Sequence, residues 1–485
     1  MVLNLHGMKY LFTLLLTTGI ILQGCNYTRR DYTDILSRIE TNLENGDFNE
    51  LYNLADSLIN NCREEDLVRK ADSLSEIARR TEIEFSLTKE DIVSELKNNK
   101  VDFNAGDIEN WEKKGWLEFR IINGNKKYFS RAVSNLGLLY SFYNDRASRD
   151  SSIAADSRII FRRNHTSDII RASKGKTDPV LPQEIEILYT LTVKPDVVPD
   201  GETVRCWLPF PKENDPRQTE VYLLAVSNED FILSPDSMTH RTIYLEQKAK
   251  AGEPVIFSIA FSYKSYGQYF DPDLMRKRPY NRNSEIFKKY TVEEPPQICF
   301  TDNVKRLADS IAGTEEDPVR IVNKIFYWFN ENIPWTSALE YSIIPDIPDY
   351  VIRNRRGDCG MQTFLLMSML RYKGIPVKWQ SGWMVPPGAE NLHDWCEVWY
   401  EGVGWVPVDL YHNLQYSKNQ KIKEFYISGI DSYRLIINDG IAGKLYPEKH
   451  FLRSEFYDFQ RGEVEWDGGN LYFDKWDYSI KINYK

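Results

Sequence analysis

The spacing of apolar residues changes near the middle of this 485-residue chain, so its two parts must fold differently. Between residues 31 and 84, apolar side chains recur every three or four residues, which places them on one face of a helix. After residue 182 the interval becomes two, as in residues 184–193, which is typical of a strand with one buried face. Residues 171–182 contain Gly and Pro and predict a linker between the parts. The sequence therefore predicts an α+β protein of several domains.

The predicted helical region covers residues 26–172 and contains a segment, 86–130, with a pattern of its own. Two helix starts are followed there by an Asn-Gly pair, a strong signal for a tight hairpin, and this order resembles a winged helix. Such a shape suggests DNA binding, but Asp107 and Glu109 at the start of its second helix would repel phosphate. We therefore expect no nucleic-acid partner, and assign the region to protein contacts or a spacer role.

Three further regions follow the linker. Residues 180–272 alternate strands with turns and predict an antiparallel β-sandwich, whereas residues 285–415 mix helices with strands. Residues 416–485 are aromatic and rich in turns, which predicts a β-rich C-terminal extension. The 29 Tyr, 23 Phe and 12 Trp of the chain fit this amount of sheet, although aromatic residues also line peptide and sugar grooves.

The N-terminus predicts export. A basic start at Met8-Lys9 precedes an apolar run, 11–22, that is too short for a comfortable membrane span. The run ends in Leu-Gln-Gly before Cys25, which is similar to the lipobox of bacterial lipoproteins. That similarity implies a signal peptide over residues 1–24 and lipidation of Cys25, hence an exported lipoprotein anchored to a membrane at the periplasm or cell surface. A secretory signal cut elsewhere and a buried apolar helix are the alternatives.

Charge and cysteine spacing exclude several classes of site. The net charge is −10, whereas a phosphate-binding protein needs a basic face. No P-loop, dinucleotide or calcium-loop pattern is present, and Glu465 and Asp467 lack metal-ligand spacing. The cysteines show no CxxC or Cys/His metal spacing, so we expect no metal and no cofactor. The sequence leaves open whether four of them pair: Cys62, Cys206, Cys299 and Cys396.

Cys359 is the first part of a candidate catalytic site. Gly357 precedes a predicted helix start and can supply an unusual turn. Cys359 then lies at the helix N-terminus, where the backbone dipole favours a thiolate, which is the nucleophilic form of cysteine. The alternative is a small buried Cys that packs the helix.

His393 and Asp409 are the second and third parts. Along a predicted strand, His393 lies on one face, whereas Asp394 and Cys396 lie on the other, which makes Cys396 a poor rival nucleophile. If the next strand pairs with this one across the turn at 401–404, Asp409 can lie beside His393. An acid there would orient the imidazole and stabilise the imidazolium.

Residues 300–412 resemble the transglutaminase-like superfamily, a papain-like cysteine fold. The motifs that carry the resemblance are Arg356-Gly357-Asp358-Cys359, the segment Leu370 to Val377, His393 to Val398, and Gly404 to Asp409. The resemblance implies a catalytic core over residues 285–415. Within it, Cys359 would be the nucleophile, His393 the general acid/base and Asp409 the orienting acid.

The resemblance also implies an oxyanion donor upstream of the cysteine. Relatives use a Trp or Gln side chain, and Trp335 is our choice here, with Trp328 and Tyr341 as competitors and a packing role open for each. Asp394 departs from the Ala or Thr that the family often has after its His, which implies an altered rim of the site. Leu410 departs from a frequent Pro, which we expect to be harmless.

Ping-pong acyl transfer through a Cys359 thioester is the chemistry that this resemblance implies. We expect a cell-envelope peptidase or amidase that cleaves an amide of a protein or peptide, since water outside the cytoplasm is abundant. A cross-linking transglutaminase would need an amine tunnel and exclusion of water. A non-enzymatic binding or scaffolding lipoprotein that retains the fold is the third hypothesis.

Overall fold

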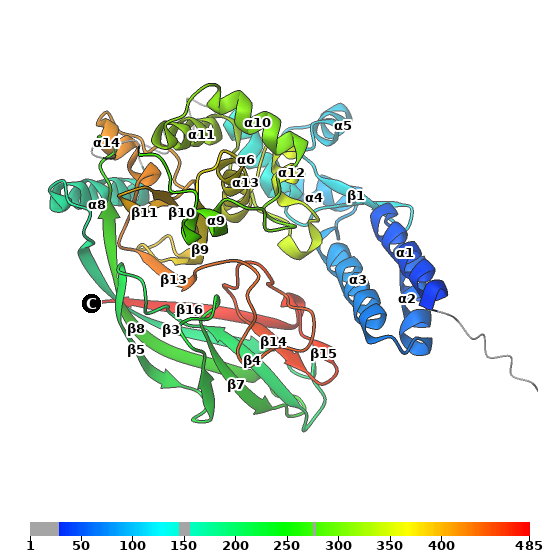
Figure 1. The fold of residues 1–485 in the computed structure, drawn as a ribbon. Coiled ribbons are helices and arrows are strands. Elements are labelled where there is room, and N and C mark those ends of the chain that lie inside the picture. Colours follow the sequence, from blue (N-terminus) through cyan, green and yellow to red (C-terminus); the bar gives the residue numbers. More distant parts are fainter. Residues whose placement is uncertain (1–28, 145–155, 274, 276–277) are drawn as a thin grey trace, which may run out of the picture. The chain divides into compact units, whose positions relative to one another are not determined.

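The computed structural model describes residues 29–144, 156–273, 275 and 278–485. These residues divide into two compact units, with the boundary between Ser75 and Glu76. In the first unit, apolar residues at helical spacing such as Ile39, Leu51 and Leu58 are fully buried. The first unit contains α1 (Arg29–Asn45) and α2 (Phe48–Asn61) (Figure 1). The boundary between the units falls within α3 (Glu65–Glu84).

The predicted signal and lipidation site, residues 1–24 and Cys25, lie outside the described residues. Among the helices that are described, none has the length and apolar character needed to cross a membrane.

The second unit begins with the predicted arrangement of two helices and a hairpin. Thr88 caps the first helix by accepting from the backbone N–H of Asp91, whose carboxylate in turn accepts from the N–H of Thr88. Asn104 caps the second helix in the same way, and Asp107 takes the place that Asp91 has in the first. The elements are α4 (Lys89–Asn98), α5 (Ala105–Lys113), β1 (Phe119–Ile122) and β2 (Asn125–Tyr128), followed by α6 (Ala132–Asn144) and α8 (Ser157–Ser173).

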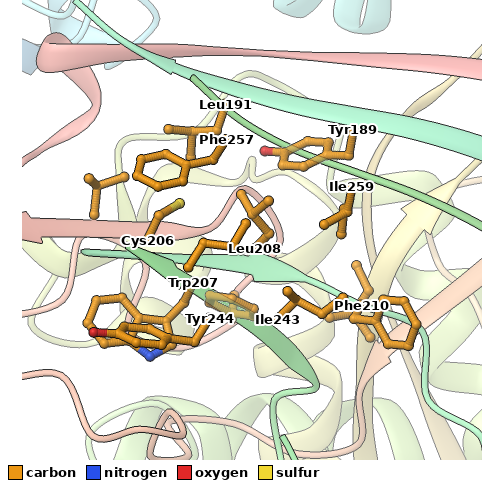
Figure 2. Packing of buried hydrophobic residues seen from close by; sticks show 14 of the residues in the cluster. Tyr189, Leu191, Cys206, Trp207, Leu208, Phe210, Ile243, Tyr244, Phe257 and Ile259 are labelled. Atoms are coloured by element: carbon orange, nitrogen blue, oxygen red, sulfur yellow. The ribbon is translucent and has the colours of Figure 1, made fainter. Parts of the chain in front are cut away.

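Two five-stranded antiparallel sheets form a β-sandwich around an apolar core. Alternation along its longest strands buries one face, and Figure 2 shows Leu191 near Phe257 and Tyr189 near Ile259 in that core. Each fully buried large apolar side chain contributes about 1.5–3 kcal/mol to folding. The strands from the predicted sandwich are β3 (Val180–Val193), β4 (Thr203–Pro209), β5 (Gln218–Val226), β6 (Phe231–Leu233), β7 (Thr242–Lys248) and β8 (Val255–Tyr269).

The C-terminal residues complete these sheets rather than forming a layer of their own. β16 (Trp476–Tyr484) pairs with β3 from Trp476 opposite Val193 to Tyr484 opposite Ile185 (Figure 1). A short turn of 3-10 helix, η3 (Phe473–Lys475), precedes this strand. The other C-terminal strands are β12 (Gly429–Ile430) on β8, β14 (Glu463–Trp466) on β4, and β15 (Gly469–Asn470) on β14.

A mixed core of helices and one four-stranded antiparallel sheet carries the candidate site. Its central helix is buried along almost its whole length and packs against the sheet and three other helices. The sheet order is β11 (Gly404–Val408), β10 (Asn391–Tyr400), β9 (Val377–Met384), β13 (Arg434–Asn438). The helices are α9 (Glu285–Tyr290), α10 (Asp302–Ala312), α11 (Pro318–Asn332), α12 (Ile347–Asn354), the central α13 (Cys359–Tyr372) and α14 (Gln420–Lys423), with 3-10 turns η1 (Tyr341–Ile343) and η2 (Phe425–Ile427).

The predicted α+β multidomain class is therefore confirmed, with a helical N-terminal region, a β-sandwich and a mixed core. The winged-helix-like segment also supports the loop before the central helix. Arg356 donates to the carbonyl of Gly115 and forms a 2.8 Å ion pair with Glu118. This loop leads directly into the candidate nucleophile.

Candidate active site

Cys359 is the first residue of α13, as the sequence predicts for a helix N-terminus. Asp358 caps the helix by accepting from the N–H of Met361 at 2.9 Å, and the hydroxyl of Tyr341 donates to the same carboxyl oxygen at 2.6 Å. A Cβ on Gly360 would lie 2.1 Å from the Tyr341 hydroxyl and 2.6 Å from an Asp394 oxygen. Only glycine therefore fits between these side chains and the first turn of the helix.

Gly357 has a different role from the one that the sequence predicts. The left-handed residue of the loop is Arg355, with φ of 52°, at the end of α12. A Cβ on Gly357 would instead lie 2.9 Å from the Cβ of Met361. Gly357 thus permits close packing against the helix rather than an unusual turn.

The Cys359 thiol is 9% exposed, and its polar contact is Asp394 rather than His393. Its Sγ donates to Oδ2 of Asp394 at 3.5 Å, and no hydrogen bond joins it to His393 within the described part of the chain. Burial raises the pKa of the thiol well above its ordinary value, and the carboxylates of Asp394 and Asp358 raise it further. These effects outweigh the helix dipole, so the resting thiol is protonated at neutral pH.

His393 and Asp409 are brought together by the strand pairing that the sequence anticipates. β10 and β11 run antiparallel with Cys396 opposite Val408, and Nε2 of His393 lies 2.8 Å from Oδ2 of Asp409. Burial lowers the pKa of His393 despite the attraction of Asp409, so the imidazole is neutral. Since Nε2 donates to the carboxylate, Nδ1 carries the free lone pair, and this buried atom has no partner among the described residues.

Arg434 of β13 is a member of this network that the sequence motifs do not reveal. It donates to Asp409 at 2.7 Å and to Asp431 at 3.0 Å, with all three groups buried. Burial alone would raise the pKa of Asp409, but His393 and Arg434 together hold it far below its usual range. Asp409 is therefore ionised at every physiological pH, as an acid that stabilises an imidazolium must be.

A cavity of about 220 Å³ reaches Cys359. Trp335, Asp394 and Tyr411 also line it, and the Tyr411 ring lies edge-on to the His393 ring with centroids 5.2 Å apart. Of the three predicted catalytic residues, Cys359 lines this cavity, whereas His393 and Asp409 do not. His393 is linked to the cavity wall through its ring contact with Tyr411.

Trp335 is the candidate oxyanion donor with a free N–H at this cavity. A parallel bridge to Gly357 fixes its backbone beside the loop before Cys359. Its Nε1 is buried and has no acceptor among the described residues. Of its two competitors, Tyr341 already donates to Asp358, and Trp328 is absent from the cavity lining.

The segment 454–461 forms one wall of the cavity, and no sequence motif predicts it. Gln460 donates from Nε2 to the carbonyl of His393 at 2.9 Å and to Oδ1 of Asp394 at 2.6 Å. The indole of Trp383 holds the carbonyl of Gln460 at 2.9 Å. The segment thus fixes both residues at the functional end of β10.

Asp394 is one of the residues that line the cavity. The sequence predicts an altered rim from this residue, and the structure places its carboxyl directly against the nucleophile. Burial raises the pKa of Asp394 well above its ordinary value, with further contributions from Asp458 and Asp358. Alternation along a strand cannot reveal this contact, because it depends on where α13 begins.

The described cysteines form no disulfide. All five cysteines that the structure describes, Cys62, Cys206, Cys299, Cys359 and Cys396, are free thiols. Within the described ranges, no three His, Cys, Asp or Glu side chains gather in a way that could hold a metal ion.

The segment that carries the site is similar to a known protein family. Residues 305–410 match the model of the transglutaminase-like superfamily, and this range contains Cys359, His393 and Asp409. No curated protein matches the sequence of the chain.

The comparison with solved structures gives matches to parts of this chain. A candidate cysteine protease from Cytophaga hutchinsonii is 15% identical, with a TM-score of 0.44 over 63% of this chain and 91% of that one. The periplasmic domain of TgpA from Pseudomonas aeruginosa is 14% identical, with a TM-score of 0.27 over 53% and 94%. A candidate protease from Parabacteroides distasonis is 13% identical, with a TM-score of 0.21 over 53% and 45%.

Proposed function

We propose that the transglutaminase-like domain of this chain is the catalytic domain of a cysteine peptidase or amidase, with Cys359 as nucleophile. The observation that carries the proposal is the free Nδ1 of His393, in a neutral imidazole that Asp409 orients from the other nitrogen. A neutral base with a fixed tautomer is what the first step of acyl transfer requires of the residue that takes the proton of the thiol.

The first half-reaction forms a thioester. The thiol leaves Asp394 and transfers its proton to Nδ1 of His393 as Sγ bonds to the carbonyl carbon of the substrate. Asp409 stabilises the imidazolium, and Nε1 of Trp335 with the N–H of Cys359 would receive the oxyanion. The C–N bond then breaks, and the proton on His393 passes to the departing amine.

The second half-reaction restores the enzyme. His393 takes a proton from water, the resulting hydroxide attacks the thioester carbon, and the C–S bond breaks. The acid product departs, and the thiol regains its proton from His393. If an amine replaced water, the same steps would give transamidation.

Digestion of a pool of unstructured peptides tests this function. Wild type and Cys396→Ala, a matched buried thiol on β10, should release new amino termini, whereas Cys359→Ala should not. Products that incorporate an added amine in place of water would show a transglutaminase instead. Intact peptides with every variant would favour a binding or scaffolding role.

Substitution of Trp335 separates an oxyanion donor from a packing residue. Trp335→Phe should lower kcat by about 10²–10³-fold with a smaller change in KM, because the lost N–H acts in the transition state. Trp379→Phe is the matched control, since Trp379 also has a buried Nε1 without an acceptor among the described residues but does not line the cavity. Equal losses in both variants would assign Trp335 to packing.

We infer further that the enzyme acts outside the cytoplasm, from the signal-like residues 1–24 and the lipobox-like ending at Cys25. Its substrate would then be a protein or peptide of the cell envelope. Metabolic labelling with a fatty acid should mark the wild-type protein and not Cys25→Ala. Labelling of both proteins would show that the lipid is attached at another residue, and labelling of neither would contradict the proposed lipid anchor.

A further inference from the structure

The cavity at Cys359 is lined by more acidic than basic groups. Five carboxyl groups and two guanidinium groups contribute to its wall. The acidic residues are Glu340, Asp358, Asp394, Glu455 and Asp458, and the basic residues are Arg131 and Arg461.

Both arginines are already paired. Arg461 donates to the two carboxyl oxygens of Glu340 at 3.0 and 2.8 Å, and its Nε donates to Glu455 at 2.8 Å. Arg131 donates to the carbonyl of Ala338 and lies 3.6 Å from Glu84. Asp358, Asp394 and Asp458 thus form no ion pair within the described structure, although the charge of Arg461 lowers the pKa of Asp458 and that of Arg131 lowers the pKa of Asp358.

Asp458 differs from the other two. Asp358 accepts from Tyr341 and Met361, and Asp394 accepts from Gln460 and Cys359. The carboxyl group of Asp458 has no hydrogen bond or ion pair within the part of the chain that is described, although the residue is only 8% exposed. Leaving a buried carboxyl group unpaired is costly unless something else completes its environment.

The backbone around Asp458 is firmly held, so its position is not accidental. Its carbonyl accepts from the hydroxyl of Ser381 at 3.0 Å and from the amide of Asn438 at 2.6 Å. Burial raises the pKa of Asp458, and the neighbouring Glu455 raises it further. A cation that entered the cavity would lower that pKa and supply the missing partner.

The size and lining of the cavity limit what it could bind. No group of metal-ligating side chains is present among the described residues, so a substrate group is the better fit. The volume of about 220 Å³ is below the ~300–1,000 Å³ of typical ligand pockets, which limits the occupant to a residue or so.

We propose that the acyl donor of this enzyme carries an ammonium group, bound by Asp458, on the residue whose carbonyl carbon Cys359 attacks. The proposal rests on the proposed function and names its substrate class. The ammonium can belong to a lysine-type side chain or to a free amino terminus, which share the same chemistry at Asp458.

Acyloxymethyl ketones test the proposal through the rate at which they alkylate Cys359. The thiolate sulfur bonds to the methylene carbon and the carboxylate leaves. Three probes are compared by intact mass: acetyl-lysyl, acetyl-norleucyl, and norleucyl with a free α-amine. The neutral acetyl-norleucyl probe has nearly the same length as the lysyl probe, so the ratio of rates isolates the charge.

We expect one of the two charged probes to label Cys359 at least tenfold faster than the neutral probe. The faster one identifies the side-chain or the α-amine source. Asp458→Asn should bring the ratio close to one, while Asp477→Asn, the same change at an exposed position of β16, should leave it unchanged. High salt should have little effect, since a buried pair is weakly screened.

Equal labelling by all three probes, or a preference that survives Asp458→Asn, would overturn the ammonium proposal and leave the nucleophile intact. Failure of every probe to label Cys359 in folded wild-type protein would instead contradict the proposed function, and with it the proposed substrate class. Melting curves of both aspartate variants show whether a lost preference reflects loss of the fold.

Discussion

Asp409 and Asp394 are both buried carboxyl groups next to members of the candidate catalytic pair, yet their pKa values are shifted in opposite directions. Asp409 lies 2.8 Å from His393 and 2.7 Å from Arg434, and its pKa is lowered. Asp394 lies 3.5 Å from Cys359 and close to other carboxyl groups, and its pKa is raised. Burial raises both pKa values, so the neighbours decide the difference.

The comparison separates the site into two sides. On the histidine side, two carboxylates share one arginine, so each carboxylate has a cationic partner without any ligand. On the cysteine side, Asp358, Asp394 and Asp458 form no ion pair within the described structure. Carboxylates that are paired hold the base in one orientation, whereas carboxyl groups without an ion pair are suited to a substrate that completes them.

Removal of the charge on Asp409 should have the largest effect. Asp409→Asn should lower kcat/KM by about 10⁴-fold, because the imidazole loses its orienting acid and the stabilisation of its charged form. Asp431→Asn removes the other carboxylate on Arg434 without touching His393 and should cost less than about tenfold. Similar losses of activity would mean that the network acts through stability alone.

Substitution of Arg434 tests whether the carboxylates of Asp409 and Asp431 depend on the cation that they share. Arg434→Met should destabilise the second unit by about 3–5 kcal/mol, since Asp409 and Asp431 would be left buried without a counter-charge. Urea denaturation of wild type and variant measures the change. A loss below ~1 kcal/mol would show that His393, or water, compensates for the arginine.

On the cysteine side, neutralisation of an acid should stabilise the fold. The pKa of Asp358 is raised to about 6 by burial, above its unfolded value, so ionisation destabilises the folded state as pH rises. The penalty starts near pH 4 and is complete above about pH 6, reaching ~3 kcal/mol. Asp358→Asn, which preserves a cap, should raise the melting temperature at pH 8 and change it little at pH 4. A lower melting temperature at pH 8 would contradict the repulsive environment.

The smallest expected effect concerns the thiol. Asp394→Asn should increase the rate of Cys359 alkylation by iodoacetamide at pH 8 by about tenfold, since loss of this carboxylate lowers the pKa of the thiol and so raises the thiolate fraction. Asp477→Asn serves as the surface control. An unchanged or slower rate would indicate that Asp394 assists deprotonation rather than opposing it.

Local patterns in the sequence were sufficient for the elements that form the histidine side. The period of two along β10 and the short turn to β11 place His393 next to Asp409, because both residues are set by one hairpin register. The helix start at Cys359 is equally local, since Asp358 caps it from the preceding position. The α+β class follows from the same patterns.

Contacts between distant segments could not be predicted in this way. Arg434, Asp458 and Gln460 reach the site from a C-terminal region whose strands pair with partners far away in the sequence. No spacing rule links them to Cys359. Their residue types are also ordinary surface types, so burial, which only the structure reveals, is what marks them as part of the site.

The most direct test of the account is the covalent intermediate on Cys359. Wild-type protein treated with 4-nitrophenyl acetate should gain one acetyl group on the peptide that contains Cys359, and neutral hydroxylamine should remove it as expected for a thioester. Cys396→Ala should behave like wild type, and Cys359→Ala should not gain this group. The assignment of Cys359 as the nucleophile would be contradicted if the wild-type protein remained unmodified. It would also be contradicted if wild type and Cys359→Ala were acetylated to the same extent, at residues other than Cys359.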